Sequence, residues 1–204
     1  MKSMGLAILA IAMLVGCSSE PSKPAQPEKP KPADLALGRT GFQKAYISAR
    51  GWARDAQPFH LESQLNGDSK GHDGRSAIWK AGFASPERRA VKPFIWSGTD
   101  ANDAPSRGVN PGTEDTYSPN NASTQVFDMA FLKVDSDKAF EVAQKHGGDK
   151  ILAKDPDTPV IYILDWTHIT NELIWHVIYG TSKDDAKLKI AINGTTGEFL
   201  RVEK

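Results

Sequence analysis

The spacing of apolar residues predicts a helix near the start of the globular part of the chain. Phe42, Ala45, Tyr46, Ala49 and Trp52 recur at intervals of three and four residues, the spacing that places side chains on one face of an α-helix. We expect this face to pack against a sheet.

A second helix is predicted about one hundred residues later. Ala139, Phe140 and Ala143 share a face, and Asp135 or Ser136 is a suitable N-cap. The pair Gly147-Gly148 is a typical helix end.

Each predicted helix is followed by extended, largely apolar segments. They span residues 59–64, 76–84 and 90–96 in the first half, and 160–165, 173–179, 187–193 and 198–202 in the second. The middle segment of each half contains a tryptophan, Trp79 or Trp175. The matching order and spacing predict a duplicated α-β-β-β unit in an α+β protein, with the strands in one curved antiparallel sheet and the helices on one face.

The two predicted halves, residues 35–97 and 125–204, are separated by a long polar segment. Residues 98–124 are rich in Asn, Asp, Pro, Gly and Ser, and a stretch of this length is typical of a functional loop or a linker. Residues 126–132 alternate well enough to predict a strand that leads into the second helix.

The first residues have the pattern of a targeting segment. The apolar run from Gly5 to Val15 follows Lys2 and is too short to span a bilayer, so residues 1–16 are interpreted as a signal peptide. The run ends in Leu14-Val15-Gly16-Cys17, which resembles the lipobox of bacterial lipoproteins. That resemblance implies that Cys17 is acylated and anchors the protein in the lipid bilayer.

Residues 17–34 then form a predicted stalk, rich in Pro, Lys and Glu and extended in character. Ser18 stands where an Asp favours inner-membrane retention in Gram-negative lipoproteins. We therefore expect a lipid-anchored protein of the cell envelope. The outer membrane, on its periplasmic or surface side, is favoured over the inner membrane.

Composition excludes several classes of function. With 25 Lys and Arg against 25 Asp and Glu, the chain lacks the positive charge of a nucleic-acid-binding protein, so no nucleic-acid partner is expected. A single cysteine excludes disulfide frameworks and CxxC chemistry.

The C-terminal third resembles a known family. Helix, strands and the closing turn Asn193-x-x-Thr196-Gly197-Glu198 are similar to the PepSY domain, over about residues 135–204. A tandem of two such units resembles the β-lactamase-inhibitor-protein architecture. The resemblance implies interaction outside the cytoplasm, in some members inhibition or chaperoning of peptidases, with no shared catalytic residues.

Candidate catalytic patterns are sparse. The five histidines, His60, His72, His146, His168 and His176, lack HxxxH or HExxH spacing, and no nucleophile elbow is present. The acidic pairs Asp135-x-Asp137 and Asp155-x-Asp157 are explained by helix capping and by a turn. We expect a non-enzyme without cofactor or metal. An enzyme acting through His60, His168 or His176 with a carboxylate remains an alternative, which predicts two of these groups within hydrogen-bond reach of each other in one pocket.

The aromatic residues at strand ends are candidates for a binding surface. Trp96 and Trp166 each end a predicted strand next to polar residues, and exposed aromatics are typical anchors of protein interfaces. With His176 and Tyr179 they form the predicted partner-binding set. The predicted function is non-catalytic protein binding in the envelope, and the resemblance implies modulation or inhibition of a peptidase. One alternative is a small-ligand or peptidoglycan-associated module with residues 98–124 as a lid. Another is a structural surface lipoprotein without a discrete partner.

Overall fold

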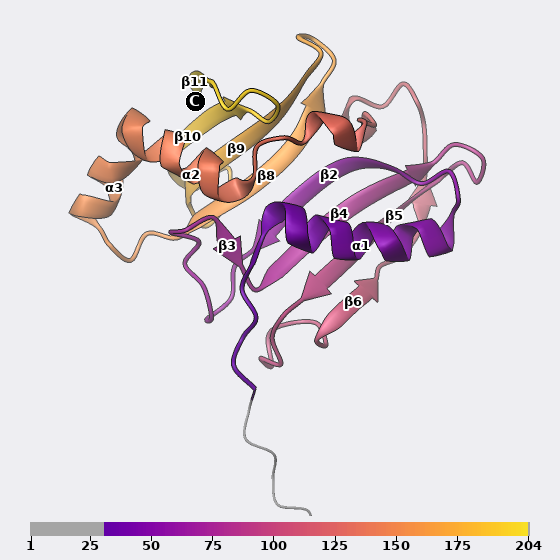
Figure 1. Ribbon diagram of the computed structural model, residues 1–204, viewed down its shortest axis with the longest axis horizontal. Helices are drawn as coiled ribbons and strands as arrows, with labels where there is room; N and C mark the ends of the chain where they lie inside the picture. Colours follow the sequence, from indigo (N-terminus) through magenta and orange to yellow (C-terminus); the bar gives the residue numbers. More distant parts are fainter. Residues whose placement is uncertain (1–30, 204) are drawn as a thin grey trace, which may run out of the picture.

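The chain folds into a large antiparallel sheet with helices on one face (Figure 1). The structure is a computed structural model that describes residues 31–203. The predicted signal peptide, Cys17 and most of the predicted stalk lie outside these residues. The α+β class and the antiparallel sheet predicted from the sequence are confirmed.

The main sheet has nine strands in the order β11-β10-β9-β8-β2-β4-β5-β6, with β7 also paired to β5. These strands are β2 (Gln57–Gln64), β4 (Ile78–Ser85), β5 (Ala90–Ser97), β6 (Gly108–Pro111), β7 (Asp115–Thr116), β8 (Val160–Thr167), β9 (Glu172–Gly180), β10 (Ala186–Asn193) and β11 (Phe199–Glu203). Two further short strands, β1 (Ala36–Leu37) and β3 (Arg75–Ser76), pair with each other.

The helices are α1 (Gly38–Trp52), α2 (Ser136–Ala143) and α3 (Asp149–Lys154), with the 3-10 turns η1 (Ala122–Thr124) and η2 (Met129–Phe131) and the π-helical turn η3 (Gln144–Gly148). In the part of the chain that the structure describes, none of them is long and apolar enough to cross a membrane.

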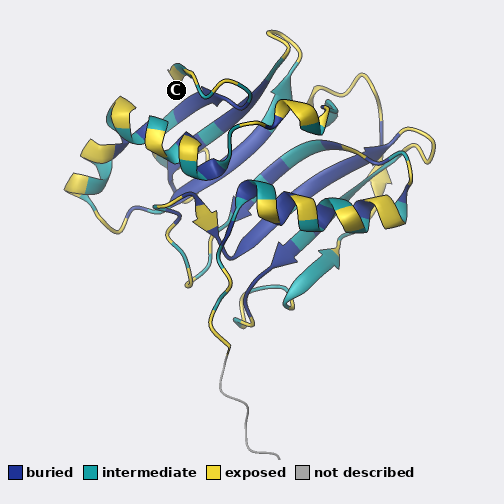
Figure 2. Cartoon of the chain, viewed as in Figure 1, coloured by how far each residue is buried: buried dark blue, intermediate teal, exposed yellow. Residues whose placement is uncertain are grey.

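Helix α1 packs on the sheet through the face that the sequence predicts. Phe42, Ala45 and Ala49 are fully buried, whereas Ile47 on the outer face is 74% exposed. Figure 2 shows the same division along the helix, with exposed residues on its outer side and buried strands beneath it. Burial of this apolar face holds the helix on the sheet.

The two halves are arranged symmetrically about the centre of the sheet. In each half, the first strand after the helix is central, and later strands lie progressively further out: β2, β4, β5 and β6 on one side, and β8, β9, β10 and β11 on the other. The strands β2 and β8 meet antiparallel at what we call the seam. The helix-then-strands order predicted for both halves is therefore present.

The two tryptophans of the predicted repeat have equivalent roles. Trp79 of β4 donates from Nε1 to the carbonyl of Ala36, and Trp175 of β9 donates to the carbonyl of Val134, each at 2.9 Å. Each acceptor lies two residues before a helix. The indole rings meet edge to face, with centroids 6.4 Å apart, so the seam is filled by aromatic packing.

The starts of the two helices also contact each other. The amide of Gly38 donates to Oγ of Ser136 at 2.8 Å, and the amide of Arg39 donates to Oδ1 of Asp135 at 2.9 Å. Ser136 in turn donates to the carbonyl of Gly74. A Cβ on Gly38 would lie 2.7 Å from the ring of Trp175, so the close approach requires glycine.

One local prediction was wrong, and two others gain detail from the structure. Residues 126–132 form no strand, because the side chain of Asp128 accepts from the amide of Ala130 and starts η2. The polar segment 98–124 includes β6 and β7, which pair with the outer edge of β5. The helical conformation is interrupted at His146 and Gly147, where Gly147 has a positive φ, as predicted, and α3 follows directly after this kink.

Candidate functional site

The sheet face opposite the helices carries a row of charged side chains. Side chains alternate along a strand, so Lys80 points away from the helix layer that buries Trp79. Glu62 of β2 accepts from Lys80 at 3.0 Å and from His60 at 3.1 Å. These three residues form one end of what we call the charge row.

The row continues across the seam into the second half. His60 pairs in register with Asp165 of β8, and His176 of β9 donates to Asp165 at 3.2 Å and to Glu203 of β11 at 2.7 Å. Arg201 donates to the other oxygen of Glu203 at 2.8 Å. His176 and Arg201 both pair in register with an alanine of β10, and this small residue lets side chains from β9 and β11 meet above it.

These contacts shift the pKa values in the row. The hydrogen bond from His60, against an opposing effect of burial and with help from Lys80, lowers the pKa of Glu62 to about 2. Burial lowers the pKa of His176, but the hydrogen bonds to Asp165 and Glu203 outweigh it and raise the value to about 9. His176 is therefore a cation at neutral pH, held between two carboxylates.

The seam is short, and the strands part beyond it. The strands β2 and β8 pair over only three positions, from His60 to Glu62, whereas β8 and β9 pair along eight. Where they separate, the turn η1 and the β8–β9 hairpin enclose a cavity of about 470 Å³, which we call the seam hollow.

The seam hollow combines charged and aromatic walls. Its charged and histidine lining residues are His60, Asp165, His168, His176, Lys183 and Arg201, and its aromatic lining residues are Phe59 and Trp166. Two of these groups have shifted pKa values: against the effect of burial, the pKa of Asp165 is lowered by the hydrogen bond from His176, and the pKa of His176 is raised. A cavity that holds such a pair is a candidate binding site.

An apolar rim lies next to the hollow. The rings of Phe131 and Trp166 lie 5.1 Å apart, and Phe131 is 43% exposed. Ile169, in the hairpin that follows Trp166, is 83% exposed. We call these three residues the distal rim, because the hairpin between β8 and β9 lies at the opposite end of the molecule from the point where the chain enters at residue 31 (Figure 1).

No metal site is evident in this region. Within residues 31–203, no group of three or more His, Cys, Asp and Glu side chains is arranged to hold a metal ion.

Comparison with known proteins gives one informative likeness, to the crystal structure of "a putative lipoprotein" from Clostridium difficile 630. The two share 13% sequence identity with a TM-score of 0.54, over 83% of this chain and 94% of that chain. The likeness establishes the fold. No family model matches the sequence, and no curated protein matches it, so the PepSY resemblance stays a prediction.

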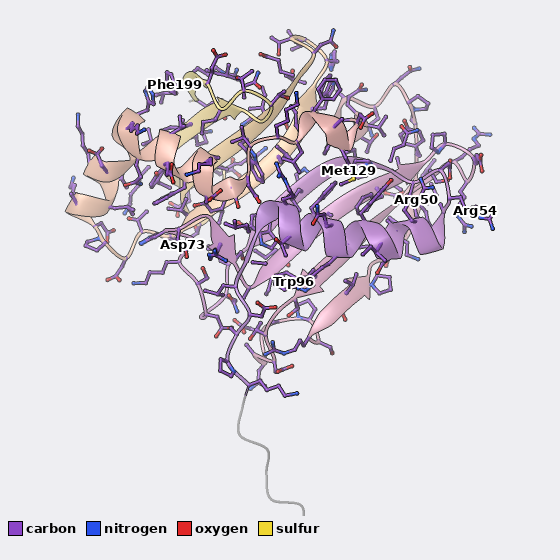
Figure 3. All side chains as sticks on the ribbon, viewed as in Figure 1. Arg50, Arg54, Asp73, Trp96, Met129 and Phe199 are labelled. Carbon is purple, nitrogen blue, oxygen red and sulfur yellow. The ribbon has the colours of Figure 1, made fainter. Side chains whose placement is uncertain are left out.

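Two of the four predicted binding residues are not exposed, and the expectation of an exposed surface there was wrong. Trp96, labelled beside α1 in Figure 3, is 3% exposed. The Lys44 ammonium of α1 lies 4.4 Å from its ring centroid, so α1 covers it. Tyr179 is fully buried, and its hydroxyl accepts from the amide of Gln144 at 2.7 Å. Both belong to the core between the helices and the sheet.

The other two predicted residues, Trp166 and His176, both line the seam hollow. Trp166 is half-buried. The side chain of His176 is 13% exposed, whereas the sequence predicted that it would face solvent or a rim. The three histidines named for the catalytic alternative, His60, His168 and His176, also line this hollow. Within residues 31–203 no hydrogen bond joins two of them, and the lining histidine and carboxylate within hydrogen-bond reach of each other are His176 and Asp165.

Sequence reasoning missed the other charged members of the site. Arg201 and Glu203 lie on the last strand, so they join His176 only through strand pairing across β10. Lys183 lies in the turn between β9 and β10 and lines the same hollow. The alternation of Arg201 and Glu203 along β11 was the available signal, because it places both on one face.

Proposed function

We propose that the protein is a lipid-anchored protein of the cell envelope that binds a protein partner through the distal rim and the seam hollow, without catalysis. The lipobox-like sequence ending at Cys17 supports the anchor, and the neighbour with the same fold is described as "a putative lipoprotein". An envelope peptidase is one partner class that the PepSY resemblance suggests.

The position of the distal rim carries the proposal. Phe131, Trp166 and Ile169 place apolar surface beside a polar cavity, the combination of apolar anchor and polar surroundings found in protein interfaces. They lie at the end away from residue 31 (Figure 1). A stalk attached at that residue would present the rim away from the membrane.

The hydrogen bonds of the hollow support a non-catalytic role. Both ring nitrogens of His176 bond carboxylates, and Nε2 of His60 bonds Glu62. In the described part of the chain, no hydroxyl is hydrogen-bonded to either imidazole, so neither ring is paired with a nucleophile as nucleophilic catalysis requires.

The anchor is tested by Cys17→Ser. The substitution removes the acylated thiol, and we expect the protein to lose incorporation of labelled palmitate and to move from the membrane to the soluble fraction. Cys17 is the only cysteine, so all thiol-linked label should disappear. Label retained by the variant would contradict the proposed anchor.

The binding surface is tested by a crosslinking pull-down from native envelopes with tagged protein. We expect wild type to recover one dominant protein, and Ile169→Asp to reduce that recovery at least tenfold, because a carboxylate would be placed at the centre of the apolar contact.

Ile47→Asp is the matched control. Ile47 is 74% exposed on the outer face of α1, close to the 83% of Ile169, so both changes are equally mild for folding. Equal recovery by wild type and Ile169→Asp, or equal loss in both variants, would refute a partner site at the distal rim.

A further inference from the structure

The mouth of the seam hollow holds two cations that are available to a ligand. Lys183 is exposed and makes no ion pair within residues 31–203. Arg201 uses only Nη2, toward Glu203, and its side chain is 51% exposed. The remaining guanidinium N–H groups can donate to an oxyanion.

The one carboxylate that lines the hollow is already neutralised. Asp165 accepts a hydrogen bond from His176 at 3.2 Å, and the protonated imidazole balances its charge. His176 and Arg201 are balanced by Asp165 and by Glu203, which accepts from both cations, so Lys183 adds to the lining a positive charge that is unmatched among the described residues. The hollow therefore favours an anion.

The remaining wall offers apolar contact and free donors. The rings of Phe59 and Trp166 and the side chain of Ile174 line the cavity. The hydroxyls of Ser123 and Thr167 also line it, and neither donates a hydrogen bond in the described part of the chain. At about 470 Å³ the cavity is in the size range of ligand pockets.

We propose that the seam hollow binds a carboxylate that carries an adjoining apolar group, with Lys183 and Arg201 holding the carboxylate and Trp166 contacting the apolar part. The carboxylate could belong to a free organic acid or to the C-terminus or an acidic residue of a protein. Only a carboxylate that belongs to a protein would make this inference rest on the proposed function.

The test is a titration of the full mature protein with N-acetyl-phenylalanine, with its uncharged amide and with inorganic phosphate, followed by backbone amide NMR. We expect saturable shifts near Ser123, Thr167 and Lys183 with a Kd of about 1 mM, as suits a ligand of this size. The amide and phosphate should bind at least tenfold more weakly, because each lacks one of the two contacts.

Variants separate the site from general charge. Lys183→Gln with Arg201→Gln should weaken binding of the acid at least tenfold. Lys145→Gln, which removes an exposed lysine from the helix layer, should leave it unchanged. Equal binding of acid and amide, equal binding of phosphate, or an equal effect of the control would overturn the proposal.

The two proposals fail separately. Binding of the acid without a protein recovered in the pull-down would keep the carboxylate site and remove the protein partner. A partner recovered through Ile169 with no binding of the acid would keep the partner site and remove this inference.

Discussion

Replacing Trp79 with alanine should lower the free energy of unfolding by about 3–5 kcal/mol, the largest effect expected of any single side chain here. Trp79 is fully buried, and its ring packs on both Tyr162 and Trp175 across the seam. The substitution would also leave the carbonyl of Ala36 without its donor. Urea unfolding of the purified protein measures the change.

Trp52→Ala is the control for loss of an indole. Trp52 is half-buried at the end of α1, and its Nε1 bonds the exposed Glu114, so we expect less than half the effect. The wild-type protein should unfold in a single transition, because the Trp79 and Trp175 rings join the halves into one core. Two separated transitions in wild type would show that the halves fold independently.

Replacing His176 with alanine should have the second largest effect, about 3 kcal/mol or more at neutral pH. The variant leaves Asp165 and Glu203, both half-buried, without the cation that lies between them. Removing one partner of a charged cluster that is shielded from water lowers the free energy of unfolding by more than the intact cluster raises it, because a charge is left without its partner. His168→Ala, in an exposed position of the hairpin, is the control and should change stability by less than about 0.5 kcal/mol.

The same histidine predicts how stability depends on pH. Its pKa rises from 6.5 in the unfolded chain to about 9 in the fold, so its contribution is complete below pH 6.5 and is lost as the pH rises through 9. The difference corresponds to about 3 kcal/mol. Unfolding curves at pH 6 and pH 10 should differ by less in His176→Ala than in wild type; an unchanged difference would contradict the bonding of His176.

Much of the fold could be predicted because its signals are local. The face of α1 follows from helical spacing at Phe42, Ala45 and Ala49, all buried as expected. The strands containing Trp79 and Trp175 follow from apolar runs with turn residues between them. The strand β6 could not be predicted, because its sequence is not that of an apolar strand and it forms only by pairing with the outer edge of β5.

The site was harder to predict because it depends on pairing between distant strands. Trp96 and Tyr179 resemble exposed strand-end aromatics in sequence, yet helices cover both. Only the order of strands reveals that α1 lies over β5, or that Arg201 meets His176 across β10. Trp166 differs from Trp96 because it ends a strand at the seam, where β2 and β8 separate and leave the hollow open.

The most direct test of the account is photocrosslinking in intact cells, with benzoylphenylalanine placed at position 169 or at position 47 of the anchored protein. The account predicts one discrete adduct from position 169 and none from position 47, since Ile47 lies on the outer face of α1. The absence of an adduct at position 169, or the same adduct at both positions, would contradict a partner site at the distal rim.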